Sequence, residues 1–270
     1  MKQHGLFWGL LLFSIFWLIP IWWMIVTAFK PDSEIFTLPP RWIPSHFTLQ
    51  HVHQVLEGWP FLRWVFNSFI VAGGATILSL FLSIPAAYSF ARMRWPGRNV
   101  LFIIFISSML LPWQVNAVPL FFLMNKLKLL NSYLSVILPI AAMPIGVFLL
   151  RQFFVNFPRD LEDAARIDGC SHLGILIRIV LPNSVAALVA MGLYIFIFSW
   201  NEFFWSLIAL QAPEKLTLPI GLKMLHGARD LDYGLLMAGA TLASLPALVL
   251  FILFRRRIIR GIALTSGIKG

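Results

Sequence analysis

The sequence predicts an all-α integral membrane protein with six transmembrane helices and a short helical hairpin between the fourth and the fifth. Composition is the first reason: 59% of the 270 residues are hydrophobic and 12% are charged, whereas a soluble domain carries about a quarter charged residues. The mean hydropathy is +0.83, so the chain has more apolar surface than water accommodates. The second reason is that the apolar residues fall into long uninterrupted windows. We expect one membrane domain over residues 1–270.

Six windows contain no Asp, Lys or Arg, and a span needs about 17 to 25 residues. The shortest window has 17 residues and the longest 28, so all six can cross a bilayer, the longer ones with tilt. The first follows Lys2 and lacks a small-residue cleavage site, so it is predicted to be a retained anchor and not a signal peptide. The windows are residues 6–29, 64–90, 100–124, 134–150, 183–210 and 233–254.

The orientation follows from the distribution of positive charge. The formal net charge is +10, and 13 Lys and Arg residues fall on the side that holds both termini, against 8 on the other side. Basic residues concentrate in cytoplasmic loops of membrane proteins, so both termini are predicted to be cytoplasmic. The same rule explains the basic balance without a nucleic-acid partner.

Cysteine and histidine give no sign of a disulfide or a metal site. Cys170 is the single cysteine, and the six histidines lie outside the apolar windows. His51 and His53 are close together, but a solvated loop explains them as well as a ligand pair does. We expect no metal and no cofactor bound by this chain.

The first outer loop, residues 30–63, contains five prolines: Pro31, Pro39, Pro40, Pro44 and Pro60. Prolines at this density favour extended segments and turns over helix. The loop is predicted to lie on the outer surface, either as a contact for an external partner or as a passive connector.

The fourth loop, residues 151–182, carries four of the eleven acidic residues of the chain within nine positions: Asp160, Glu162, Asp163 and Asp168. Pro158 ends the preceding element, Asp160 is expected to cap a new helix with Asp163 in the capping-box position, and Gly169 is expected to close it. Ser171 then caps a second helix, residues 172–180, which is expected to end before Pro182. In this hairpin Ala164 and Ala165 form a small-residue flank for a partner, while Leu173, Ile177 and Val180 are expected to anchor the second helix.

A family resemblance rests on this loop. The stretch from Asp163 to Gly169, followed by residues 179–182, resembles the E-A-A-x3-G-x9-I-x-L-P signature of ABC importer permeases. Asp163 in place of Glu is the one departure. Weaker matches occur in order along the chain and point to the carbohydrate-uptake permeases of this family: Phe29-Lys30 with Glu34-Ile35-Phe36, Asn67-Ser68, Arg94 to Gly97, Leu111-Pro112, Ser199 to Phe203, and Gly267 to Gly270.

The resemblance implies a type I importer fold, a location in a bacterial inner membrane, and a set of partners. Two homologous permeases would form the pathway, two ATPase subunits would dock on their signature loops, and an extracytoplasmic binding protein would deliver the solute. ATP and Mg would be used by the ATPase, because this chain has no phosphate-binding G-x-x-x-x-G-K-[ST] sequence. The expected coupling residues are Asp160, Glu162, Asp163, Ala164, Ala165, Asp168, Gly169, Ile179, Leu181 and Pro182. The tail residues Gly267, Lys269 and Gly270 either reach the ATPase or form a plain terminus.

Glu202 is the only Asp, Glu, Lys or Arg inside any window. An ionisable group at membrane depth suggests a role in the pathway, and Trp200 and Asn201 add an apolar face and hydrogen bonds that suit a sugar. The alternative is that Glu202 lies at headgroup level or bonds a neighbouring helix. Asn67, Gln114 and Asn116 are further pathway candidates, or polar contacts between helices.

Two other functions stay open at this stage. The cargo of an ABC permease could be a non-sugar solute such as a polyamine or a phosphorylated polyol. An ion-coupled secondary carrier could use Glu202, although carriers usually show internal repeats, which the two halves lack. A membrane enzyme is disfavoured because no cluster of His, Asp or Ser converges within the windows.

Overall fold

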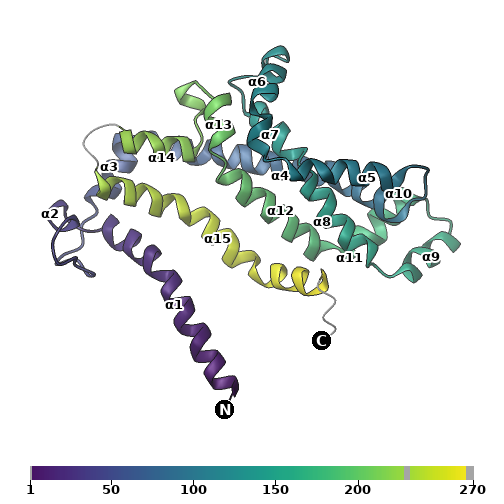
Figure 1. The fold of residues 1–270 in the computed structure, drawn as a ribbon, viewed down its shortest axis with the longest axis horizontal. Coiled ribbons are helices and arrows are strands. Elements are labelled where there is room, and N and C mark those ends of the chain that lie inside the picture. Colours follow the sequence, from purple (N-terminus) through teal and green to yellow (C-terminus); the bar gives the residue numbers. More distant parts are fainter. Residues whose placement is uncertain (1, 228–231, 266–270) are drawn as a thin grey trace. The chain divides into compact units, whose positions relative to one another are not determined.

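The computed structural model describes residues 2–227 and 232–265, and over these ranges the chain is helical with no strand. Its helices are shown and labelled in Figure 1. Its contacts divide the chain into two compact units. Unit 1 comprises residues 1–65 and 218–246, and unit 2 comprises residues 66–217 and 247–270. The long helices α4 (Phe61–Arg92) and α15 (Tyr233–Thr265) each contribute to both units.

Unit 1 contains α1 (Lys2–Ala28), α2 (Asp32–Ile35), α3 (Gln50–Gly58) and α14 (Leu218–Gly227). The expectation that residues 30–63 form extended segments and turns is wrong for the short α2 and for α3, which forms in the proline-free stretch after Pro44. Its buried residues are His51 and Val55. The His51 ring lies against Gly234, where an added Cβ would be 2.2 Å from its Cε1 atom. The absence of a side chain at Gly234 therefore makes room for α3.

Unit 2 is built around α4, α8 (Pro144–Val155) and α12 (Val185–Trp200), and α12 packs along α8. Further members of this unit are α5 (Arg98–Ser107), α6 (Ala117–Lys126), α7 (Tyr133–Ala141) and α13 (Phe204–Ala209). The short turns are η1 (Ser108–Leu110), η2 (Trp113–Asn116) and η4 (Pro213–Lys215). Between α8 and α12 lie α9 (Arg159–Ile167), α10 (His172–Ile175), the π turn η3 (Leu176–Val180) and α11 (Leu181–Asn183).

Four helical stretches are long and apolar enough to cross a membrane: Gly5–Ala28, Phe61–Arg92, Tyr133–Val155 and Tyr233–Arg255. Two bent pairs, Arg98–Leu110 with Trp113–Lys126 and His172–Asn183 with Val185–Trp200, bring the number to six when each pair is one span. The helical membrane fold is therefore confirmed.

The boundaries differ from the expected windows where prolines or polar residues interrupt the helix. The window 100–124 is bent by 95° at Leu111 and Pro112, because proline lacks an N–H group and disfavours helix in the residue before it. The window 183–210 is not one helix either: α12 ends at Trp200, and α13 begins at Phe204. The last helix continues past residue 254 to Thr265.

Candidate functional site

The predicted hairpin is present, and its first helix, α9, begins at Arg159, two residues earlier than a helix capped by Asp160 would. Pro158 occupies the cap position and no side chain caps the helix, so the prediction that Asp160 is the cap is wrong. Asp160 instead lies in the first turn with Glu162, where carboxylates interact favourably with the positive end of the helix dipole. At the other end Gly169 has φ +79°, the left-handed conformation that closes a helix, as predicted.

The second helix starts as predicted and ends later. Ser171 accepts a hydrogen bond from the Gly174 amide at 3.2 Å, so it is the cap. The helix does not stop before Pro182, because η3 widens into a π turn and the chain stays helical to Asn183. Pro182 lies in the first turn of α11, where a missing amide costs no hydrogen bond within that helix.

The residues that anchor this second helix differ partly from those expected. Val180 is buried, together with Ile175 and Leu176. Leu173 and Ile177, predicted as anchors, are 64% and 53% exposed. Ser184 adds a contact at the end of this helix, because its hydroxyl donates to the Val180 carbonyl at 2.6 Å within the buried interior.

Helix α9 has one buried face and one exposed face. Glu162 and Ala165 are buried in unit 2. The other predicted coupling residues of this helix and its closing turn are exposed: Asp160, Asp163, Ala164, Asp168 and Gly169. The exposed set is therefore acidic and carries small residues, and it is open to a partner.

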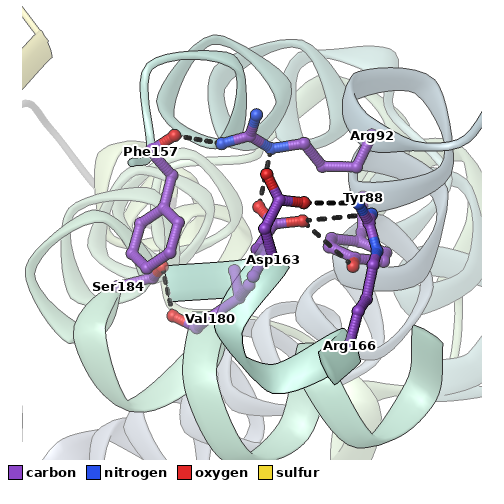
Figure 2. A network of polar contacts seen from close by, with 8 residues as sticks. Tyr88, Arg92, Phe157, Asp163, Arg166, Val180 and Ser184 are labelled. Atoms are coloured by element: carbon purple, nitrogen blue, oxygen red, sulfur yellow. Dashed lines mark hydrogen bonds and ion pairs between the residues drawn. The ribbon is translucent and has the colours of Figure 1, made fainter. Parts of the chain in front are cut away.

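Glu162 connects α9 to the end of α4 through an ion pair. Figure 2 shows this network of polar contacts, with Tyr88, Arg92 and Phe157 labelled. The Arg92 Nε atom lies 2.9 Å from Glu162 Oε1, and both side chains are less than 5% exposed. The second Glu162 oxygen faces the Tyr88 hydroxyl at 3.5 Å. Arg92 also donates through Nη2 to the Phe157 carbonyl, which immediately precedes the hairpin. Two consecutive turns of α4 thus hold the base of the hairpin through charged and polar contacts.

A second ion pair on α9 is solvent-exposed. Arg166 Nη1 lies 2.8 Å from Asp163 Oδ1, three residues away, and its Nη2 atom is 3.9 Å from Glu162. The Arg166 and Asp163 side chains are 44% and 59% exposed. Exposed pairs of this kind contribute about 0 to 1 kcal/mol, so the buried contact to Arg92 is the stronger attachment.

Arg92 and Tyr88 were not predicted as site residues. Arg92 is recognisable in the sequence as the first basic residue after the window 64–90. Nothing in its spacing indicates a partner 70 positions later. The structure identifies Glu162 as the partner of Arg92, because it brings the end of α4 against α9.

Part of the predicted pathway set lines one cavity of about 560 Å³. Gln114, Asn201 and Glu202 are among its lining residues, together with aromatic side chains that include Trp113, Tyr194 and Phe198. Asn67, Asn116 and Trp200 are not among them. The structure therefore brings together three of the six predicted residues beside several aromatic rings.

Glu202 has a structural task as well as a position at this cavity. Its Oε1 accepts the Trp205 amide at 2.7 Å, and its Oε2 accepts the Ser206 amide at 2.8 Å and the Ser206 hydroxyl at 2.6 Å. These are the free amides at the start of α13, so the carboxylate caps that helix. The cost of burying its charge is offset by these three donors.

Asn67 is buried and fully engaged in holding elements of unit 2 together. Its Nδ2 donates to the carbonyls of Glu214 and Leu216 at 2.9 and 2.8 Å, and its Oδ1 accepts the Tyr133 hydroxyl at 2.7 Å. The side chain thus connects α4 to α7 and to the segment around η4. The predicted tail residues Gly267, Lys269 and Gly270 lie outside the described residues.

These features define a helical, multi-pass membrane protein whose bundle carries an acidic hairpin fastened by a buried ion pair. Residues 79–263 match the family model described as "Binding-protein-dependent transport system inner membrane component". The chain belongs to this family, and it is a transport component of the membrane.

Curated relatives align over nearly the whole chain. The arabinooligosaccharides transport system permease protein AraQ of Bacillus subtilis is 35% identical, covering 96% of this chain and 93% of its own length. The sulfoquinovosyl glycerol transport system permease protein SmoH of Agrobacterium fabrum is 32% identical over 94% of this chain and 89% of its own length. The diacetylchitobiose uptake system permease protein DasC of Streptomyces coelicolor is 31% identical over 93% and 91%.

The fold also matches a solved structure. A chain in the crystal structure of a bacterial ABC transporter that imports the acidic polysaccharide alginate superposes with a TM-score of 0.83. The match covers 95% of this chain and 97% of that chain at 22% identity. This likeness confirms the importer permease fold.

Proposed function

We propose that this chain is one of two permease subunits in an ATP-driven importer of sugars or oligosaccharides. It forms half of the translocation pathway, and α9 docks on a separate ATPase subunit. The proposal rests on the different environments of the two faces of α9. Its exposed acidic face is available to a partner, while Glu162 on its buried face is ion-paired to Arg92 of α4.

This arrangement suits mechanical coupling. When ATP draws two ATPase subunits together, a helix docked on one of them moves with it. A rigid attachment passes that movement to α4 and so to the spans, which switch between inward-open and outward-open states. ATP and Mg belong to the ATPase partner, and both termini of this chain lie on the ATPase side of the membrane.

A carbohydrate cargo is supported by the named substrates of the relatives, which include arabinooligosaccharides and diacetylchitobiose. A further solved relative is an alginate ABC transporter in complex with a pentasaccharide-bound periplasmic protein, and it shares the fold with a TM-score of 0.67. An external binding protein and a second permease are therefore the other partners that we propose. The aromatic cavity with Gln114 and Asn201 is the candidate place for contact with a sugar.

The alternatives are weaker on stated grounds. A secondary carrier would need Glu202 free to exchange an ion, whereas its oxygens are engaged at the start of α13. A different cargo of the same importer class, such as a phosphorylated polyol, is compatible with the fold. The experiment below distinguishes these possibilities.

The test is ATPase activity of the purified assembly reconstituted in lipid, with and without its binding protein and with a panel of sugars. We expect one sugar class to stimulate the wild type. The variant Gly169→Asp is expected to lose both ATPase association and stimulation, because it strains the turn that closes α9. Purification of a folded chain without any ATPase, together with solute transport driven by an ion gradient, would overturn the proposal.

A further inference from the structure

A second and larger cavity, of about 1210 Å³, lies in unit 2 between the end of α4, the start of α5, the end of α8 and α9. Sites for small molecules commonly measure about 300 to 1,000 Å³. This cavity is therefore large enough for a polar headgroup and the beginning of its chains.

The lining of the cavity carries an excess of positive charge. Its lining includes two acidic residues, Glu162 and Asp163, and one histidine, His172. Six arginines line it as well: Arg92, Arg94, Arg98, Arg151, Arg159 and Arg166. Glu162 pairs with Arg92 and Asp163 pairs with Arg166. Within the described ranges the other four arginines have no carboxylate within ion-pair distance.

Two of these four guanidinium groups are held in place by neutral contacts. Arg98 Nη1 donates to the Met93 carbonyl at 2.9 Å. The Arg151 guanidinium lies 4.1 Å from the centroid of the Phe102 ring, and its Nε donates to the Phe90 carbonyl at 3.4 Å. Their positive charge is therefore positioned but not neutralised, which favours an anion as the occupant.

The depth of the cavity indicates which anion. Arg92 ends the span Phe61–Arg92, Arg98 begins the bent pair that starts α5, and Val155 ends the span Tyr133–Val155, and all three residues line the cavity. Three candidate spans thus start or stop at its wall, which puts it at headgroup level. The Trp95 indole is also in the lining, as is typical of a membrane interface.

Apolar surface continues from the cavity along α5. Val100 lines the cavity and is 63% exposed, and Leu101, Ile103 and Ile104 on the same helix are 50 to 61% exposed. An occupant with a phosphate group in the cavity and acyl chains along α5 would satisfy both surfaces. A soluble anion would use the charges alone.

We propose that this cavity binds the phosphate-bearing headgroup of an anionic phospholipid, with Arg94, Arg98, Arg151 and Arg159 as its charge partners. Basic pockets between transmembrane helices are a known way of holding acidic lipids. Binding at this place puts a lipid beside Glu162 and Arg92, so the composition of the membrane can influence the attachment of α9. The site is independent of the cargo.

The test is native mass spectrometry of the full-length chain in mixed micelles of phosphatidylglycerol and phosphatidylethanolamine. We expect retained phosphatidylglycerol on the wild type and about five-fold weaker retention for each guanidinium removed. The double variant Arg94→Gln/Arg159→Gln is the first choice because both side chains are exposed. Arg98→Gln is the second. Arg178→Gln is the matched control, since Arg178 is exposed on the same hairpin and is not in the lining.

Competition identifies the occupant. Inorganic phosphate and glycerol 1-phosphate at millimolar concentration should leave phosphatidylglycerol bound; if either displaces it, the site is for a soluble anion and the lipid proposal fails. Equal retention by the wild type and the double variant, at equal thermal stability, also overturns it. If a co-purified ATPase excludes the lipid, the cavity is a protein interface and the proposal fails. None of these readouts depends on transport, so they are separate from the test of the proposed function.

Discussion

At the residue scale, hydrogen bonds within the protein explain why the Glu202 carboxylate is buried, and no contact with a substrate is needed. Its carboxylate accepts the amides of Trp205 and Ser206 three and four residues later, together with the Ser206 hydroxyl. It also lines the aromatic cavity. The cap and the pathway role make different predictions.

Replacement Glu202→Gln separates them. A glutamine presents one acceptor oxygen and an amide that faces donors, so we expect a loss of about 1 to 2 kcal/mol in stability and retained sugar uptake. The measurements are thermal unfolding and uptake in reconstituted vesicles. Asn201→Ala, which removes a proposed sugar contact from the same cavity without removing a bond to the α13 amides, is the comparison variant and should lower uptake at near wild-type stability. Loss of uptake at wild-type stability would contradict the cap as the main role of Glu202.

The Arg92–Glu162 pair predicts a large effect from a single substitution. Arg92→Gln leaves the Glu162 carboxylate buried without its charge partner, which typically costs about 3 to 5 kcal/mol. We expect reduced stability and weaker ATPase stimulation. Arg166→Gln, which removes an exposed guanidinium from the same network, should change stability by at most about 1 kcal/mol.

A charge exchange tests whether the pair itself is responsible. The double variant Arg92→Glu/Glu162→Arg should recover part of the stability that either single reversal loses, as measured by a double-mutant cycle on thermal unfolding. Additive losses would indicate that the two residues act separately, and the attachment of α9 would then have to lie elsewhere.

At the scale of elements, the closing turn of α9 depends on Gly169. Its φ of +79° is unfavourable for residues with a Cβ, and no atom lies within 4 Å of an added Cβ. Gly169→Ala should therefore cost about 1 to 2 kcal/mol through the backbone alone. We expect weaker co-purification of the ATPase.

Gly97 offers a control with the same backbone constraint. It has φ +80° and equally open surroundings, and it lies before α5 and outside the hairpin. Gly97→Ala should lose similar stability and keep ATPase association. Equal loss of association in both variants would show that general destabilisation, and not the hairpin, is responsible.

The loop between α1 and α3 is stabilised by pH-dependent contacts to Glu34. The Ser45 hydroxyl and amide donate to Glu34, and Arg41 Nη1 lies 2.7 Å from its Oε1. The hydrogen bonds from Ser45, followed by the charge of Arg41, hold the pKa of Glu34 below its ordinary value.

Because the pKa is lower in the folded state, the stability from Glu34 is complete above the unfolded value of about 4.3. It is lost as the pH falls through the folded value. Ser45→Ala should reduce this dependence, which thermal unfolding of both proteins from pH 7 to pH 3 would measure. Parallel curves would contradict the assigned role of these contacts.

At the scale of the whole molecule, the interrupted spans have a common cause. Pro112 bends the third window, and Asn201 to Phe203 separate α12 from α13. In a membrane, irregular backbone persists where side chains or other elements satisfy its polar groups. At the break between α12 and α13, the Glu202 side chain accepts hydrogen bonds from backbone amides. Trp113 follows the bend at Pro112, and it lines the aromatic cavity together with Glu202. Residues from both helix breaks therefore line the aromatic cavity.

The sequence by itself determined the membrane class, the acidic hairpin, the Ser171 cap and the left-handed turn at Gly169. Each of these is a local property, because apolar runs, capping residues and glycine turns depend on neighbours within a few positions. The Glu202 cap is equally local, and its spacing to Trp205 and Ser206 could have revealed it.

The tertiary structure alone decided which face of α9 is buried, that Glu162 meets Arg92, and that Asn67 joins α4 to α7 and the η4 segment. These contacts join residues 66 to 149 positions apart. Neither residue type nor spacing specifies such partners, since any arginine can pair with any carboxylate. The choice is made when the helices pack, because a charge that becomes buried is stable only if an opposite charge lies close to it.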